Sequence, residues 1–323
     1  MARMLSSAVV AAALFALGAG CDRHRAHDEA PPPAPAPPPA AAPGCTIAPL
    51  PLRLPAPRRL VAIGDLHGDL GGARAALRAA GAIDDRDRWI GGDLVVVQTG
   101  DVLDRGDDER ALLDLIAELE TEAHAAGGAV IALLGNHELM NGAGDFRYVT
   151  PAGLHAFDDA GAPAAGAGDR GGRLGALGAG GRYARRLARH AVIAIVGDTV
   201  FSHAGVLGDW VHRVDEVNQT ARCWLDGQAG EPPVALTSDD SPVWTRAAGG
   251  AGVDCAQVTA ALAALGVRRM VVGHTVQPGG ITSACDGALW RIDVGLARGY
   301  GGPIQVLELA PDAPPKVVTG TRG

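Results

Sequence analysis

The chain has 323 residues, of which 47% are hydrophobic and 20% are charged, and this composition excludes a largely disordered protein. At roughly 100 to 200 residues per domain, the length allows one large domain or two small ones. The formal net charge of -8 argues against a nucleic-acid partner, because such an interface needs a basic face to displace counterions. We therefore expect a folded domain of enzyme size.

The first 21 residues have the features of a secretion signal. Arg3 precedes an apolar run that ends at Leu17, and small residues precede Cys21. The run is shorter than the roughly 20 residues that a membrane-spanning helix needs, which favours a cleaved signal. The sequence LGAGC at 17–21 resembles a bacterial lipobox, although Gly18 replaces the usual larger aliphatic residue. We expect export to the periplasmic side and a lipid anchor on Cys21; an ordinary signal peptide with an incidental cysteine is the alternative.

A Pro/Ala-rich linker is expected at residues 22–57. It includes PPPAPAPPPAAAPG at 31–44, a composition that favours extended polyproline II and cannot pack a core. Four further cysteines could form two disulfides in an oxidising compartment, with three possible connectivities, or could remain as free buried thiols. These cysteines are Cys45, Cys223, Cys255 and Cys285.

Short aliphatic runs bounded by turn residues recur from residue 59 onward. They predict buried strands at 60–63, 94–98, 129–134, 191–196, 269–273 and 304–309. Helical patterns lie between them at 71–80, 107–125, 210–225 and 254–266, so the predicted fold class is a layered α/β fold. The predicted domain covers residues 58–312, with a Gly/Ala-rich insertion of helices and loops at about 141–190 and a tail at 313–323.

Five polar clusters stand at the predicted strand ends, where open α/β sheets bind their ligands. The clusters are GDLHGD (64–69), GDVLDRG (100–106), GNHE (135–138), SHAG (202–205) and VGHT (272–275). One such motif alone is more often a turn or a buried structural histidine, but five together favour a metal site. They supply oxygen and imidazole ligands that suit divalent metals. The candidate ligands are Asp65, His67, Asp101, Asn136, His203 and His274.

These clusters, in this order, resemble those of the calcineurin-like metallophosphoesterases over about residues 60–302. The resemblance is to the phosphoprotein phosphatase type, and GNHELMNGAGDFRYV (135–149) and VWTR (243–246) are similar to blocks of the Shewanella-like protein phosphatases. It implies a metallophosphoesterase fold with a central mixed β-sandwich flanked by helices. It also implies two divalent ions, with manganese as the first candidate and iron or zinc as alternatives.

The resemblance further implies a role for each matching residue. Asp65 and His67 would bind the first ion, and Asp101 would bridge both ions. The second ion would be bound by Asn136, His203 and His274. A histidine that many superfamily members have in the last motif is replaced by Val276 here, as in the phosphoprotein phosphatases, so the first ion has one protein ligand fewer.

Four other residues would act on the phosphoester. His137 matches the catalytic histidine and would protonate the leaving oxygen, with Asp104 as its orienting carboxylate. Arg105 matches the phosphate-binding arginine of the second cluster. Arg246 is a candidate second phosphate ligand, and a surface arginine in a salt bridge is the alternative interpretation.

The implied function is a dinuclear-metal phosphatase that hydrolyses phosphomonoesters, with phosphorylated protein side chains or small phosphoesters as substrates. A nucleotide or dinucleoside-polyphosphate hydrolase is an alternative, because such enzymes share the five clusters. A lipid-anchored binding protein on a degenerate phosphatase fold is the non-enzymatic alternative. The presence of Asp101, Asn136 and His137 argues against degeneration.

Overall fold

The computed structural model describes residues 44–51, 53–311 and 313–322. The predicted signal, Cys21 and the linker up to residue 43 therefore lie outside the described residues. Within the described part, no helix is both long enough and apolar enough to cross a membrane.

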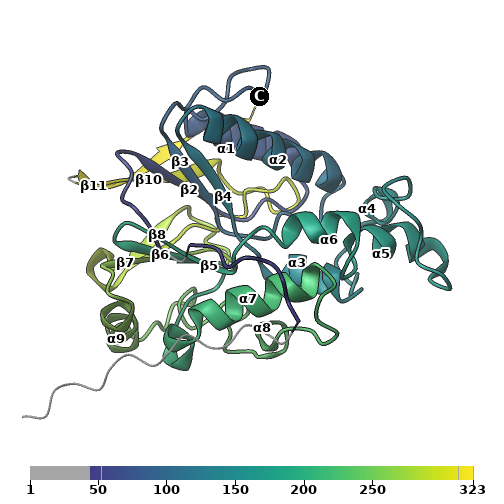
Figure 1. Cartoon of the computed structure of the whole chain (residues 1–323). Coiled ribbons are helices and arrows are strands. Elements are labelled where there is room, and N and C mark those ends of the chain that lie inside the picture. Colours follow the sequence, from purple (N-terminus) through teal and green to yellow (C-terminus); the bar gives the residue numbers. More distant parts are fainter. Residues whose placement is uncertain (1–43, 52, 312, 323) are drawn as a thin grey trace, which may run out of the picture. The chain divides into compact units, whose positions relative to one another are not determined.

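Two mixed β-sheets form the centre of the fold (Figure 1). The first has the order β11-β10-β2-β3-β4, in which β2, β3 and β4 are parallel, β10 is antiparallel to β2, and β11 is antiparallel to β10. Its strands are β2 (Leu60–Ile63), β3 (Val95–Gln98), β4 (Ala129–Ala132), β10 (Gln305–Ala310) and β11 (Ala313–Thr319). The second has the order β1-β5-β6-β7-β9-β8. Its strands are β1 (Arg53–Leu54), β5 (Ile193–Val196), β6 (Thr199–Ser202), β7 (Arg269–Val272), β8 (Thr282–Ala284) and β9 (Leu289–Arg291).

Alternation along the strands explains why the sheets pack as a sandwich. Ala62 of β2 and Val97 of β3 join a buried cluster with Phe201 and Val271 of the other sheet. Val61, next to Ala62, belongs instead to the larger cluster that includes the helices, because neighbouring side chains in a strand point to opposite faces. The predicted fold class is therefore confirmed: two mixed sheets face each other and helices cover the outside.

The helices cover the outer faces of the two sheets. Figure 1 shows α1 (Leu70–Ala79) and α2 (Glu109–Ala125) over the five-stranded sheet, and α7 (Val214–Leu225) and α9 (Cys255–Leu265) over the six-stranded one. Local signals explain the ends of α9: the Asp254 side chain accepts from the N–H groups of Ala256 and Gln257, and Gly266 ends the helix with a φ of 63°. The shorter elements are η2 (Gly208–His212), α8 (Val234–Thr237) and η3 (Cys285–Gly287).

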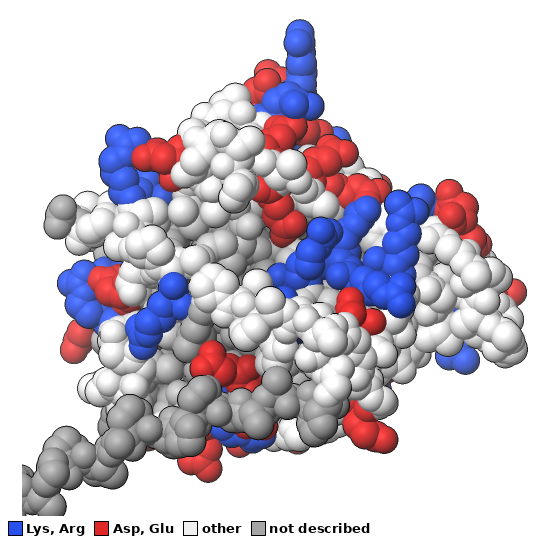
Figure 2. Space-filling view, viewed as in Figure 1, with Lys and Arg blue, Asp and Glu red and all other residues white. Residues whose placement is uncertain are grey.

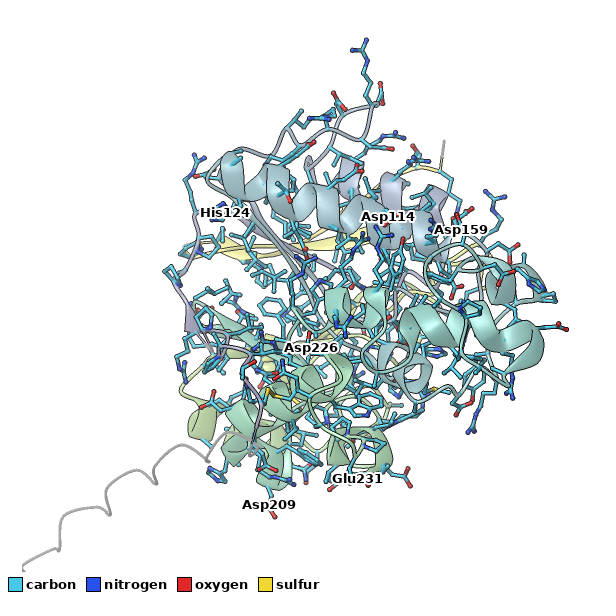
Figure 3. All side chains as sticks on the ribbon, turned by 45° about the vertical axis from the view of Figure 1, so that its right-hand side comes forward. Asp114, His124, Asp159, Asp209, Asp226 and Glu231 are labelled. Atoms are coloured by element: carbon cyan, nitrogen blue, oxygen red, sulfur yellow. A yellow bond between two sulfur atoms is a disulfide. The ribbon has the colours of Figure 1, made fainter. Side chains whose placement is uncertain are left out.

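The Gly/Ala-rich stretch at 141–190 consists of short helices and turns. They are the end of α3 (Asn136–Gly142), then α4 (Pro151–His155), η1 (Gly168–Arg170), α5 (Gly171–Leu177) and α6 (Arg182–Leu187). Ion pairs tie this stretch to α2: Arg186 pairs with Asp114 and Arg110 with Asp159, and both carboxylates are labelled in Figure 3. Figure 2 shows basic side chains gathered over the region of α6, with acidic ones beside them.

Several elements of the structure differ from the sequence-based expectations. β6, β8 and β9 were not predicted, because their sequences TVFS, TSA and LWR are short and lack the continuous aliphatic run that marks the predicted strands. β1 lies in the expected linker and pairs with β5, and β11 lies in the expected tail and pairs with β10. The folded region therefore extends beyond 58–312 at both ends.

Two disulfides join the four cysteines whose pairing the sequence left open. Cys45 pairs with Cys223, and Cys255 pairs with Cys285. The first disulfide fixes the segment that begins at Cys45 on α7, where Gln219 also donates to the carbonyl oxygen of Ile47 at 2.9 Å. Residues 45–48, which were assigned to the linker, are thus part of the folded unit.

Candidate metal centre

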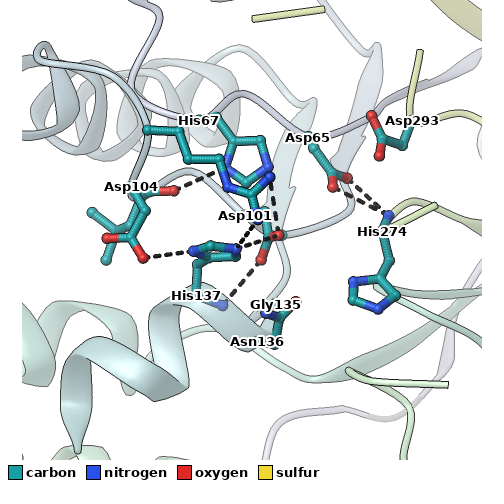
Figure 4. A network of polar contacts seen from close by, with 12 residues as sticks. Asp65, His67, Asp101, Asp104, Gly135, Asn136, His137, His274 and Asp293 are labelled. Atoms are coloured by element: carbon teal, nitrogen blue, oxygen red, sulfur yellow. Dashed lines mark hydrogen bonds and ion pairs between the residues drawn. The ribbon is translucent and has the colours of Figure 1, made fainter. Parts of the chain in front are cut away.

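The loops that follow β2, β3, β4, β6 and β7 meet at one site, and Figure 4 labels residues from those after β2, β3, β4 and β7. Four predicted clusters lie on these loops or at the adjoining strand ends, and the fifth, GNHE, forms the start of α3, so the structure brings all five together. The cluster SHAG follows β6 and not the predicted strand at 191–196. His203 of this cluster reaches the other site residues because β6 runs parallel to β7, so that both strands end at the same edge of the sheet. Five predicted site residues have positive φ, which is rare outside glycine and concentrates at functional sites. They are His67, Asp101, Asp104, Arg105 and His274.

Asp101 lies at the centre of the site. Its Oδ2 atom is 3.3 Å from His203 Nε2 and 3.7 Å from both His67 Nε2 and His137 Nε2. His203 Nε2 is also 3.0 Å from His274 Nδ1 and 2.9 Å from Asn136 Oδ1. The buried carboxylate thus belongs to two groups of potential ligands at once.

Each of the two groups has its donor atoms within 4.8 Å of one another. One group is His67, Asp101 and His137, and the other is Asp101, His203 and His274. A close approach of the backbone makes this possible: a Cβ on Gly135 would collide with Asp101, so glycine is required beside the carboxylate. Gly135 precedes the candidate ligand Asn136 in the same cluster, which explains that part of the motif.

Hydrogen bonds to carbonyl oxygens set the tautomers of the three predicted ligand histidines. His67 Nδ1 donates to Leu103 at 3.1 Å, His203 Nδ1 to Thr99 at 2.9 Å, and His274 Nε2 to Trp244 at 3.1 Å. A carbonyl only accepts, so in the neutral form of each histidine the other ring nitrogen has the lone pair and is available as a ligand. Backbone partners of this kind are typical of metal-ligating histidines.

Burial keeps two of these imidazoles neutral. It lowers the pKa of His67 to about 4 and that of His274 to about 3. For His274 the neighbouring His203 adds to the effect, because two positive rings would repel each other. Both rings are therefore uncharged near neutral pH, which is the form that binds a metal ion.

Buried carboxyl groups concentrate negative charge around Asp101. Burial, reinforced by Asp293 and Asp101, raises the pKa of Asp65 well above its usual range, and burial followed by Asp101 raises that of Glu138. For Asp101 burial acts in the same direction, but the imidazoles of His203 and His137 outweigh it and hold its pKa well below the usual range. Divalent cations would relieve this repulsion. The donor set of carboxylate oxygen, amide oxygen and imidazole nitrogen fits such ions.

Asp65 has a different position from the other predicted ligands. Its carboxylate accepts the backbone N–H of His274 at 3.2 Å and lies 3.9 Å from His203 Nδ1. Asp65 lies outside the two tight groups of ligand atoms but inside the same set of loops (Figure 4).

Two buried carboxyl groups of this site had no predicted role. Asp293, after β9, is 2% exposed, and burial is the first cause that raises its pKa. Because β9 was not predicted, only a lone aspartate in LWRIDVG marked this position. Glu138 was within GNHE, and its carboxylate accepts N–H groups of Asp101, Val102 and Gly135. Glu138 thereby joins the loops after β3 and β4.

His137 lies between Asp101 and a second carboxylate. Its Nδ1 donates to Asp104 Oδ2 at 2.5 Å, and its Nε2 is 3.2 Å from Arg105 Nη2. Burial alone would lower the pKa of His137, but the carboxylates of Asp101 and Asp104 outweigh it and raise the pKa. The raised pKa favours the protonated imidazole, which is the form that a general acid needs.

Arg105 is exposed and is placed by two aromatic rings. Its guanidinium lies 4.9 Å from the ring centre of Tyr148 and 5.5 Å from that of Tyr300. It borders a cleft of about 440 Å³. Other residues that line the cleft are His67, Asp69, Asp107, Asp108, Thr150 and Arg298. A phosphate group in this cleft could reach Arg105 from solvent.

Arg246 lies beside the second group of ligands. Its Nη1 donates to the carbonyl oxygen of His274 and to Thr275 Oγ1, both at 3.3 Å. Among the residues that the structure describes, no carboxylate forms an ion pair with Arg246.

Comparisons with known proteins agree on one family and one fold. Residues 58–278 match the family model described as calcineurin-like phosphoesterase. The chain is 38% identical over 302 residues to Shewanella-like protein phosphatase 2 of Arabidopsis thaliana, covering 81% of this chain and 77% of that protein. It is 29% identical over 261 residues to Shewanella-like protein phosphatase 1 of Plasmodium berghei, covering 76% and 69%. In fold it is similar to the cold-active protein-tyrosine phosphatase of a psychrophilic Shewanella species, with a TM-score of 0.70, 24% identity and coverage of 84% and 83%.

Proposed function

Because the chain belongs to the calcineurin-like phosphoesterase family, we propose that it hydrolyses phosphomonoesters of phosphorylated protein side chains with two divalent ions. The family and the phosphatase relatives make it a metal-dependent phosphoester hydrolase. The observation that carries the dinuclear proposal is the shared position of Asp101, which belongs to both groups of ligand atoms. The names of the relatives, Shewanella-like protein phosphatases, support phosphoproteins as the substrate class.

The proposed ligands divide between the two ions. Asp65 and His67 would hold the first, Asp101 would hold both, and the remaining three residues would hold the second, with manganese proposed ahead of iron or zinc. The remaining three are Asn136, His203 and His274. Ions bound here would supply a water nucleophile near neutral pH and neutralise charge on the phosphoryl oxygens.

The chain's own side chains would bind the phosphate and move the proton. Arg105 lies exposed at the cleft, where its fork of N–H donors can bind two phosphate oxygens, and Arg246 would bind the phosphate from beside His274. His137 would donate its Nε2 proton to the leaving oxygen. Asp104 would hold the imidazole in place through Nδ1 and stabilise its positive form.

The test is hydrolysis by the purified full-length chain, with Asp101→Asn as the control. A generic aryl phosphate should be hydrolysed with at least one of manganese, iron, zinc or magnesium, and the control should be inactive under the same conditions. Phosphoserine, phosphothreonine and phosphotyrosine peptides should then be turned over faster than dinucleoside polyphosphates. Faster turnover of the polyphosphates would support the nucleotide-hydrolase alternative instead. No hydrolysis with any metal, together with an empty metal site, would support the binding-protein alternative.

We also propose that the protein is exported to the periplasmic side and anchored through a lipid on Cys21. The signal and Cys21 lie outside the described residues, so the support comes from the folded part. Its two disulfides, Cys45–Cys223 and Cys255–Cys285, are of a kind that persists in oxidising compartments.

A further inference from the structure

Arg173 of α5 is completely buried, with an exposed fraction of 0%. A buried charge is costly unless it is paired and its hydrogen-bonding groups are satisfied. All five N–H donors of its guanidinium have partners. Nη1 and Nη2 bind the two oxygens of Glu109 at 2.5 and 2.8 Å, and Nη1 also donates to the carbonyl oxygen of Gly153 at 2.8 Å. Nη2 donates to Asp104 Oδ1 at 3.1 Å, and Nε to Asn141 Oδ1 at 2.8 Å.

The partners of Arg173 surround the carboxylate that holds His137. Asp104 Oδ1 accepts from Arg173 and also from Asn141 Nδ2 at 2.8 Å. Its other oxygen, Oδ2, is the one that accepts from His137 Nδ1. Glu109, paired with Arg173, accepts the backbone N–H of Asp104 at 2.5 Å. The guanidinium therefore fixes both the side chain and the backbone of Asp104.

Aromatic rings restrict the guanidinium itself. Phe146 and Phe157 have their ring centres 5.5 and 5.4 Å from it, and Phe157 is fully buried. Arg173 therefore has a single well-defined position, and its contacts reach residues 69 and 64 positions away in sequence. It comes from the Gly/Ala-rich stretch, which contains none of the predicted site residues.

We propose that Arg173 is a positioning residue for proton donation to the leaving group. It saturates Asp104 Oδ1, so that Oδ2 remains directed at His137 Nδ1 and His137 Nε2 is directed at the leaving oxygen. The stretch at 141–190 thereby takes part in the reaction through a residue that does not contact the substrate. This proposal rests on the proposed phosphatase function and on the acid role of His137.

The direct test is Arg173→Lys, which retains the charge but replaces a rigid fork of five donors by a single ammonium group. Turnover is measured on two substrates, with the metal ions supplied in the assay. One is a phosphoserine peptide, whose alkoxide leaving group needs a proton. The other is an activated aryl phosphate, whose phenolate leaving group does not. We expect kcat for the peptide to fall about 10- to 100-fold, as for other residues that orient a functional side chain, and kcat for the aryl phosphate to change far less.

A second variant covers the case in which Arg173→Lys does not fold. The pair Arg173→Gln and Glu109→Gln removes one positive and one negative buried charge together, which avoids an uncompensated carboxylate at Glu109. It should give the same selective loss on the peptide.

Arg222→Lys is the matched control for a general effect of a buried arginine. Arg222 lies on α7 and is 4% exposed. Its guanidinium donates to the carbonyl oxygens of Ala188 and Ala48. This variant should lower the melting temperature without separating the two substrates. The same substrate pattern in Arg222→Lys would overturn the proposal, since the effect would then come from loss of stability.

The second control is the His137→Asn background. If Arg173 acts through His137, Arg173→Lys should cause no further loss of peptide turnover there, because residues that act as a unit are not additive. A full additional loss, or equal losses on both substrates in the native background, would overturn the positioning role. Equal losses for His137→Asn alone would overturn the acid role and this proposal with it. Absence of all phosphoester hydrolysis in the native protein would instead overturn the proposed function.

Discussion

Removal of the Cys45–Cys223 disulfide should destabilise the protein more than removal of Cys255–Cys285. The first closes a loop with a sequence separation of 178 residues and the second one with a separation of 30. Loop-closure entropy then predicts a stabilisation of about 5.2 kcal/mol for the first and about 3.7 kcal/mol for the second, which is a difference of roughly 1.5 kcal/mol.

Local contacts act in the same direction. The first disulfide fixes residues 45–48 on α7, where Gln219 binds the carbonyl oxygen of Ile47 and Arg222 binds that of Ala48 at 2.9 Å. Once the disulfide is removed, these hydrogen bonds alone must hold residues 45–48 on α7. The hydrogen bonds should therefore be weakened along with the crosslink.

Thermal and urea unfolding of two double variants measures the difference. One carries Cys45→Ala with Cys223→Ala, and the other Cys255→Ala with Cys285→Ala. At about 2 to 4 °C per kcal/mol for domains of 150 to 250 residues, the first should melt roughly 3 to 6 °C below the second. Equal melting temperatures, or a lower one for the second variant, would refute the loop-length reasoning. An unchanged melting temperature of the native protein in strong reductant would refute both disulfides.

The remaining predictions concern the site and the anchor. Asp101→Asn should lose more bound metal than any other ligand variant, because its carboxylate lies in both groups of ligand atoms; full occupancy of two ions by mass spectrometry of metals would contradict this. His137→Asn should keep both ions and lose about 10² to 10⁴ in rate on an alkyl phosphate but far less on an activated aryl phosphate. Retained metals with equal losses on both would exclude the acid role. Cys21→Ser should abolish metabolic labelling with a fatty acid, and undiminished labelling would rule out the anchor on this cysteine.

The main strands, the long helices and the five polar clusters could be predicted from the sequence because their signals are local. The run at 60–63 is a strand in the structure, and the patterns at 71–80 and 254–266 match α1 and α9 to within about one residue at each end. Each polar cluster is a continuous stretch, so its residue types and spacing are visible without a partner.

The tertiary structure alone decided which distant residues meet. Asp293 enters the site through β9, a strand of three residues with no readable period, and Glu138 joins two loops through backbone bonds that leave no pattern in the sequence. Cys45 and Cys223 meet although 178 positions separate them. Arg173 is the clearest case, since an arginine in a Gly/Ala-rich stretch is ordinarily a solvated side chain. Its burial follows from its position between the loop of Asp104 and the first turn of α2, which carries Glu109, and a buried guanidinium requires carboxylate partners that only the folded chain can bring to it.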